Sequence, residues 1–168
     1  MRAFIVDNNV PIAANDDSDA SPECVISAIE LLYEVQNSMI VLDDTQQIYL
    51  EYKKYLDFNP MPQMPGKSFY LWVHENQFNP AKCEQVVIAP HPDRGFEEFP
   101  EDEELQKFDK ADRKFIAVFF KSVNSPTIYN STDSDWAQFG SAFERLGIRI
   151  TNICPADLAN KKSKLSDH

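Results

Sequence analysis

Acidic side chains stand at four separated places in this chain where carboxylates could share a metal ion. Two of these places follow short apolar segments, and two lie beside apolar residues that repeat at helical spacing. A carboxylate next to a hydrophobic core needs a counter-charge, and one divalent cation supplies it to several carboxylates at once. The sequence therefore indicates a metal site built from distant segments, with these candidates: Asp7, Glu51, Asp112 and the pair Asp133 and Asp135.

Short apolar strands alternate with amphipathic helices along the chain. This alternation predicts an α/β fold with three layers, α/β/α, around a central and mainly parallel sheet. Strands are expected at residues 3–6, 39–42, 85–89 and 127–130, with an edge strand at 148–153.

The helices carry clear start and stop signals. Ser21 and Pro22 are typical of a capping residue and the first helical position. The segment Asp43-Asp44-Thr45 offers a cap to the helix that contains Glu51. Residues 105–123 are expected to form one long helix, and a last helix after Asp135 should end at Gly147.

The expected topology places several of the acids at one edge of the sheet. In open parallel sheets, binding sites form beyond the carboxyl ends of the strands. Asp7 ends the first strand and Asp133 follows the strand 127–130, so both should lie along that edge. Glu51 and Asp112 could reach the same edge from flanking helices.

Length and composition favour a single folded domain. The chain has 168 residues, of which 43% are hydrophobic, and we expect one domain over 1–155, an irregular insert at about 57–103, and a short mobile basic tail at 156–168. No segment approaches the roughly 20 apolar residues of a membrane helix. We therefore expect a cytoplasmic protein without a membrane contact.

The cysteines give no metal or redox motif. Cys24, Cys83 and Cys154 are far apart and no CxxC is present. An odd, sparse set of cysteines suggests free thiols in a reducing cytoplasm. His74 and His91 are isolated, so ordinary hydrogen bonds are expected for them in preference to zinc binding.

Four motifs in order resemble those of the PIN-domain family of metal-dependent ribonucleases. The segment Asp7-Asn8-Asn9-Val10 is similar to the opening Asp-x-Asn motif of that family, and Thr45 to Glu51 resembles its glutamate helix. Asp112 precedes an apolar helical run like that of the third acid. Thr132-Asp133-Ser134-Asp135-Trp136 resembles the fourth motif, although no residue separates Thr132 from Asp133.

The resemblance implies a PIN-like fold and hydrolysis of RNA phosphodiester bonds with Mg²⁺ or Mn²⁺. Asp7 and Asp112 would be ligands shared between two metals, Asp133 a third ligand, and Glu51 a ligand directly or through water. Asp135 would be water-held or a helix cap, while Asn9 and Thr132 would support the site.

Simpler roles stay open for each acid. Asp133 and Asp135 are typical helix caps, Glu51 could pair with Lys53 or Lys54, and Asp109 rivals Asp112 as the third acid.

The functional hypotheses belong to different classes. The first is an endoribonuclease, with a toxin of a toxin–antitoxin pair as one setting; its partners would be RNA, a basic protein such as an antitoxin, and a second copy in a homodimer. The alternative is a PIN-like protein-interaction module with weak or no catalysis, which the net charge of −11 would suit. A haloacid dehalogenase-type phosphatase is disfavoured because Asn9 stands where its general acid would be needed.

Overall fold

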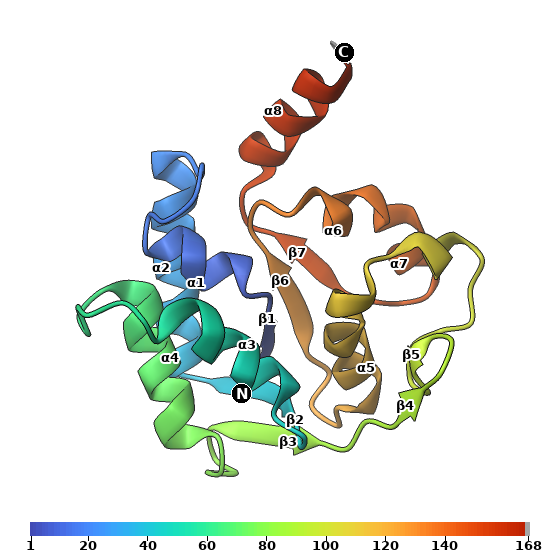
Figure 1. Ribbon diagram of the computed structural model, residues 1–168, viewed down its shortest axis with the longest axis horizontal. Coiled ribbons are helices and arrows are strands. Elements are labelled where there is room, and N and C mark those ends of the chain that lie inside the picture. The colour runs from blue at the N-terminus through green and yellow to red at the C-terminus, as the bar shows by residue number, and fades with distance from the viewer. Residues whose placement is uncertain (167–168) are drawn as a thin grey trace.

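Five short strands form one parallel sheet in the computed structural model, which describes residues 1–166 (Figure 1). The strand order is β3-β2-β1-β6-β7, and every pair is parallel. The expected α/β fold is confirmed at this level, with a sheet that is wholly parallel. The strands are β1 (Ala3–Val6), β2 (Met39–Asp43), β3 (Cys83–Val86), β6 (Thr127–Asn130) and β7 (Ile150–Asn152).

The order of the strands reverses between β1 and β6. The chain builds outward from β1 through β2 to β3, then returns to place β6 on the other side of β1. Such a reversal is the place where open parallel sheets bind their ligands, because neighbouring connections leave the sheet in opposite directions there. All four residues of β1 are buried, as expected for the central strand of a covered sheet.

Helices flank the sheet on both sides. The helices α1, α2 and α4 gather on one side, and α5, α6 and α7 lie on the other (Figure 1). Right-handed crossovers produce this division, since the chain travels in opposite directions along the sheet in its two halves. The first six helices in chain order after β1 are α1 (Asn9–Ala14), α2 (Pro22–Gln36), α3 (Gln47–Leu56), α4 (Pro65–Asn76), α5 (Arg113–Lys121) and α6 (Ser134–Gln138), followed by α7 (Gly140–Arg145) and α8 (Pro155–Ser166).

The expected helix caps are present in α2 and α3. The Ser21 hydroxyl accepts a hydrogen bond from the Cys24 N–H at 3.2 Å. The Asp43 carboxylate accepts from the N–H groups of Gln47 and Ile48, both at 2.9 Å. Asp43 is thereby committed to holding α3 at the end of β2.

The single long helix expected over 105–123 was wrong. This segment forms two short 3-10 turns, η1 (Glu104–Lys107) and η2 (Lys110–Asp112), before α5. Phe108 takes an extended conformation, with φ −65° and ψ 137°, which breaks the helix. Asp109 then caps η2 by accepting a hydrogen bond from the Ala111 N–H at 3.0 Å.

A buried arginine holds this broken segment in place. The Arg113 guanidinium donates to the carbonyls of Leu105, Gln106 and Phe108 and, from the preceding loop, Arg94. It also lies 4.4 Å from the ring centre of Phe99. Burial lowers the pKa of Arg113, so the cation is held at an electrostatic cost by carbonyl dipoles. Arg113 thus fixes the position of the backbone segment that precedes Asp112.

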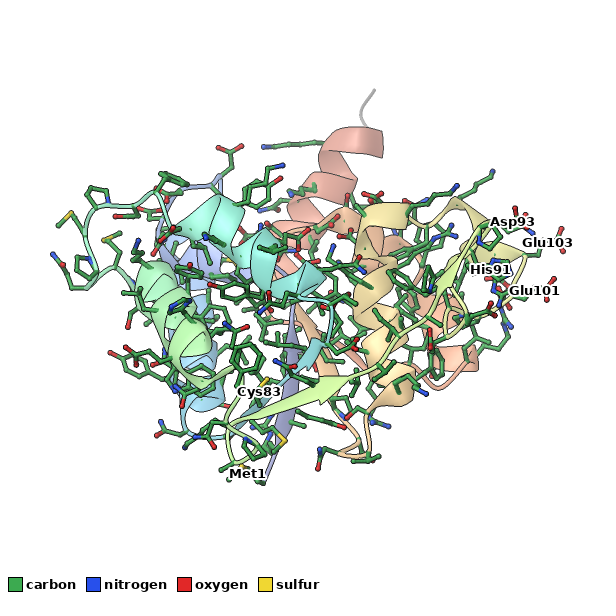
Figure 2. The ribbon with its side chains drawn as sticks, turned by 60° about the horizontal axis from the view of Figure 1, so that its bottom comes forward. Met1, Cys83, His91, Asp93, Glu101 and Glu103 are labelled. Atoms are coloured by element: carbon green, nitrogen blue, oxygen red, sulfur yellow. A yellow bond between two sulfur atoms is a disulfide. The ribbon has the colours of Figure 1, made fainter. Side chains whose placement is uncertain are left out.

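The segment 57–103 is more regular than expected. It contains α4 and β3, together with a hairpin of β4 (Pro90–His91) and β5 (Gly95–Phe96). The strand expected at 85–89 lies at Cys83–Val86. Figure 2 shows His91, Asp93, Glu101 and Glu103 close together at the outer end of this region. The His91 ring accepts hydrogen bonds from the N–H groups of Asp93 and Arg94, an ordinary structural role.

The helix expected between Asp135 and Gly147 is divided into two helices. The segment after residue 155, expected to be a mobile tail, is helical. In place of one helix ending at Gly147, the chain forms α6 and α7, and Gly147 follows with φ 74°. The expected edge strand at 148–153 is β7 (Ile150–Asn152), at one end of the sheet. Residues 156–166 of the expected tail belong to α8 (Pro155–Ser166), which extends away from the rest of the fold (Figure 1); residues 167–168 lie outside the described part.

Two of the cysteines form a disulfide, which corrects the expectation of three free thiols. Cys24 in the first turn of α2 is bonded to Cys154, directly before α8, across a sequence separation of 130. Beside it, the Ser21 N–H and hydroxyl donate to the Asp157 carboxylate at 2.8 and 2.6 Å. Sequence spacing could not reveal this pair because only the fold brings its members together.

The remaining cysteine is buried. Cys83 is a free thiol in β3 (labelled in Figure 2), and burial raises its pKa to about 12. Disulfides are typical of oxidising compartments, so the cysteines do not support the cytoplasmic prediction. Within residues 1–166, none of the helices has the length and apolar character needed to cross a bilayer.

Removing the disulfide should lower the free energy of unfolding. Replacing both Cys24 and Cys154 by Ser releases the unfolded chain from a loop closed over a separation of 130. Cross-links over long loops contribute about 2–4 kcal/mol. Urea unfolding of the double variant, compared with the unreduced native protein, should show a loss of this size.

Counting thiols provides the control. In denaturant without reductant, one thiol (Cys83) should react with a thiol reagent, and all three cysteines should react after reduction. Three reactive thiols before reduction would contradict the disulfide.

Candidate metal site

Three aspartates meet at the carboxyl edge of the sheet. Asp7, Asp112 and Asp133, here called the acidic trio, each offer one carboxylate oxygen, and these atoms lie within 4.8 Å of one another. Asp7 directly follows β1, Asp133 follows β6, and Asp112 directly precedes α5. The trio therefore sits at the reversal point of the strand order, where the topology favours a ligand site.

Asp7 is the most deeply buried member and its orientation is fixed. It is 5% exposed. One oxygen, Oδ1, accepts hydrogen bonds from the Asn9 N–H at 2.9 Å and the Asn9 side-chain amide at 2.7 Å. The other, Oδ2, accepts from the Trp136 indole N–H at 2.8 Å. These donors hold the carboxylate in one orientation toward the other two acids.

Asn9 links the ends of β1 and β6. Its Nδ2 donates to Asn130 Oδ1 at 2.9 Å as well as to Asp7. Its Oδ1 accepts from the Ser131 N–H at 2.7 Å and the Ser131 hydroxyl at 2.5 Å. The supporting role expected for Asn9 is thus a bridge between two strand ends.

Asn130 is a site residue that sequence reasoning missed. It is fully buried at the end of β6. Its Nδ2 donates to the main-chain carbonyl of Asp133 at 2.9 Å, and its Oδ1 accepts from the Asp133 N–H at 3.2 Å. The sequence did hold a signal for it: Asn130 is a polar residue at the end of an apolar strand, and a buried polar side chain requires hydrogen-bond partners.

Asp112 and Asp133 differ in how their carboxylates are held. Asp133 caps α6 by accepting from the Asp135 N–H at 2.9 Å. Within the described residues, no hydrogen-bond donor is found for the Asp112 carboxylate, although it is half-buried. Asp112 therefore has free acceptor capacity next to two other acids.

Burial raises the pKa values of all three aspartates, and nearby negative charges add to this effect. Burial raises the pKa of Asp7 to about 7, against hydrogen bonds from Asn9 and Trp136 that lower it. Burial, followed by the negative charges of Asp7 and Asp133, raises the pKa of Asp112 to about 8. Burial also raises the pKa of Asp133. Such a site resists holding three negative charges unless a cation joins it.

The structure brings three of the four predicted acidic segments together, and the fourth acid, Glu51, forms an ion pair. Glu51 is outside the trio, and its Oε1 accepts a hydrogen bond at 3.1 Å from Lys114 Nζ, not from Lys53 or Lys54.

The Tyr52 hydroxyl donates to the Val6 carbonyl at 2.5 Å, which fixes this turn of α3 beside the end of β1.

The other sequence candidates have local roles. Asp109 caps η2 and is not in the trio, so Asp112 is the acid that the fold brings to Asp7. Asp135 gives its N–H to Asp133 and is also outside the trio. The Thr132 carbonyl accepts a hydrogen bond from Lys161 of α8, which brings a cation to the border of the site.

A buried amide oxygen lies next to the trio in sequence. Asn8 Oδ1 has no hydrogen-bond partner among the described residues, although it is inaccessible to solvent. Buried polar atoms are rarely left unpaired, and those that are commonly mark a water or ion.

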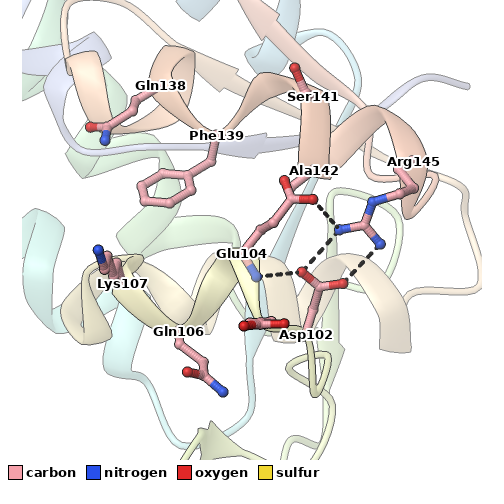
Figure 3. A pocket seen from close by; sticks show the side chains of 10 residues that line it. Asp102, Glu104, Gln106, Lys107, Gln138, Phe139, Ser141, Ala142 and Arg145 are labelled. Carbon is pink, nitrogen blue, oxygen red and sulfur yellow. Dashed lines mark hydrogen bonds and ion pairs between the residues drawn. The ribbon is translucent and has the colours of Figure 1, made fainter.

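A surface hollow lies away from the trio. It has a volume of about 840 Å³ and is lined by residues of η1, α6 and α7. Three of its charged groups pair with one another: the Arg145 guanidinium binds Asp102 at 2.9 Å and Glu104 at 3.3 Å (Figure 3). Within residues 1–166 no ion pair is found for the acidic trio, which makes the trio the stronger candidate site.

Comparisons with known protein families, with curated proteins and with solved structures find no match to this chain.

The pKa of Asp112 predicts how stability depends on pH. Its folded pKa is raised to about 8 from 3.8, so the folded state holds a proton that the unfolded state loses. The stability of the metal-free protein should fall as the pH rises from about 4 to 8. Asp112→Asn removes the part of this decline that Asp112 causes, and since Asp112 is partly exposed we expect a gain of about 1–3 kcal/mol near pH 8.5.

Thermal unfolding in EDTA at about pH 4.5 and pH 8.5 measures this effect. The advantage of Asp112→Asn over the native protein should grow with pH. Asp44→Asn, which removes an exposed carboxylate outside the trio, is the matched control and should show no such trend. A difference that is equal at both pH values would refute the raised pKa.

Proposed function

We propose that this protein is a metal-dependent ribonuclease of PIN type. It would hydrolyse RNA phosphodiester bonds with Mg²⁺ or Mn²⁺ bound by Asp7, Asp112 and Asp133. The observation that carries the proposal is the meeting of these three carboxylates at the reversal point of a parallel sheet. Asp7 and Asp133, the two members of the trio furthest apart in sequence, are separated by more than a hundred residues.

The donor set suits a hard divalent cation. All three groups supply carboxylate oxygen, which Mg²⁺ and Mn²⁺ prefer over softer ligands. The Asp112 carboxylate has no competing donor among the described residues, and the fixed orientation of Asp7 lowers the entropic cost of binding. The raised pKa values are those of a site completed by positive charge.

The sequence motifs support a nuclease over other uses of an acidic site. The three acids of the trio belong to segments that resemble the first, third and fourth PIN motifs, in the same order. Asn9, at the third position of the first motif, carries an amide without a titratable proton and so cannot be the general acid of an aspartyl phosphatase; this amide donates a hydrogen bond to Asp7.

The bound ion would lower the pKa of a coordinated water and offset charge on the phosphate. The protein supplies the geometry for this chemistry. Asn9 and Trp136 orient Asp7, and Asn130 fixes the main chain of Asp133. Arg113 binds carbonyls of the segment before Asp112 and so fixes the backbone that carries Asp112.

Two lysines of α8 lie at the border of the site. The overall charge of −11 repels RNA, so binding needs local positive charge. Lys161 binds the Thr132 carbonyl, and Lys164 lines the same hollow between α8 and the loop before α2, which Asp17, Asp19 and Asp157 also line.

Neutralising one member of the trio should abolish cleavage. Asp112→Asn keeps the side-chain shape and breaks no hydrogen bond of the carboxylate, so it should fold while losing at least about 100-fold in rate. The assay is Mn²⁺-dependent cleavage of single-stranded RNA, with Asp44→Asn as the folded control of equal charge. Cleavage that survives Asp112→Asn and excess EDTA would exclude the mechanism. Metal binding without cleavage of any RNA would favour the interaction module.

Metal affinity should increase with pH. The ion binds ionised carboxylates, and Asp7 and Asp112 have pKa values of about 7 and 8. Below these values each proton that must leave weakens binding by about tenfold per pH unit. Calorimetry with Mn²⁺ between about pH 6 and 8 should show the dissociation constant falling steeply, whereas carboxylates of ordinary pKa would give a flat profile.

A further inference from the structure

A lysine and a glutamate form a buried ion pair at the edge of the acidic trio. Lys114 Nζ lies 3.1 Å from Glu51 Oε1 and also donates to the Ala111 carbonyl. The side chains are only 9% and 21% exposed. Lys114 Nζ lies 5.0 Å from the centre of the Phe115 ring, so the ammonium is enclosed by an aromatic face and two acceptors.

This pair belongs to the same corner of the fold as the trio. Lys114 comes two residues after Asp112, at the start of α5. Glu51 precedes Tyr52, whose hydroxyl binds the carbonyl of Val6, the residue before Asp7. Helices α3 and α5 are in contact at this point. The ammonium therefore stands between the segments that carry Glu51 and Asp112.

A carboxylate that holds a buried ammonium is a poor metal ligand. If Glu51 turned to a metal, Lys114 would remain buried without a charged partner, which is strongly unfavourable. A two-ion site would need Glu51, because the trio alone offers three carboxylates within reach. With Lys114 present, two divalent ions would bring five positive charges against four carboxylates, whereas one ion brings three.

We propose that Lys114 takes the place of a second metal, so that the native site binds a single divalent ion. The proposal rests on the metal site of the proposed function and adds its stoichiometry. Glu51 is then the fixed counter-ion of Lys114, not a ligand of the metal.

Counting bound Mn²⁺ tests this directly. The native protein at about pH 8 should bind one Mn²⁺ per chain in calorimetry and give the spectrum of an isolated ion in electron paramagnetic resonance. Lys114→Met removes the charge and keeps an apolar side chain of similar length, which frees Glu51. This variant should bind two Mn²⁺, with the coupled signal of ions about 3.5–4 Å apart.

Two further variants complete the test. Lys53→Met removes an exposed lysine of α3 and should keep one bound ion. The double variant Glu51→Gln/Lys114→Met removes both charges of the ion pair and leaves no buried charge unpaired. It should bind one Mn²⁺ with a dissociation constant within about threefold of that of the native protein, which remains informative if Lys114→Met alone fails to fold.

The outcomes separate this proposal from the one on which it rests. Two ions in the native protein, one ion in folded Lys114→Met, or a loss of tenfold or more in affinity from Glu51→Gln/Lys114→Met would each overturn the role of Lys114. No saturable binding to the native protein would remove the metal site itself, and the proposed ribonuclease with it.

Discussion

The site depends on the bridge that Asn9 makes between the ends of two neighbouring strands. Parallel pairing of β1 and β6 brings Asp7 and the loop of Asp133 to one edge. The Asn9 amide then binds Asp7, Asn130 and Ser131 together, so the two strand ends cannot separate. Without this polar bridge, like-charged carboxylates would move apart toward water.

The same arrangement holds carboxylates of like charge close together, which is electrostatically unfavourable in the folded state. Asp7 and Asp112 are held where burial and mutual repulsion oppose their ionisation. A fold selected only for stability would place apolar residues or separated charges there, since buried charges are costly. Strain that is maintained by dedicated hydrogen bonds is typical of a site that exists to bind something.

Local patterns predicted much of this architecture from the sequence. The alternation of strands and helices gave the parallel sheet, Ser21 and Pro22 gave the start of α2, and parallel strand ends correctly brought Asp7 toward Asp133. Each of these depends on neighbours in sequence or on a general rule of topology.

Long-range partners explain what the sequence could not predict. The helix expected over 105–123 broke because Arg113 binds carbonyls that a continuous helix would have used internally. Glu51 found Lys114, 63 residues away, in preference to a lysine on its own helix. The packing of distant elements decides which of these pairs forms. Residue spacing along the chain does not reveal that packing.

The bond between Cys24 and Cys154 also makes most of the chain a covalent ring. The ring contains β2, β3, β6 and β7, while β1 enters it from the short N-terminal arm and pairs at its centre. Proteolysis at one exposed point of the ring, such as the proline-rich segment 57–64, would therefore release no fragment until a reductant was added. Nicked molecules would keep their mass, apart from one added water, and could retain both halves of the sheet.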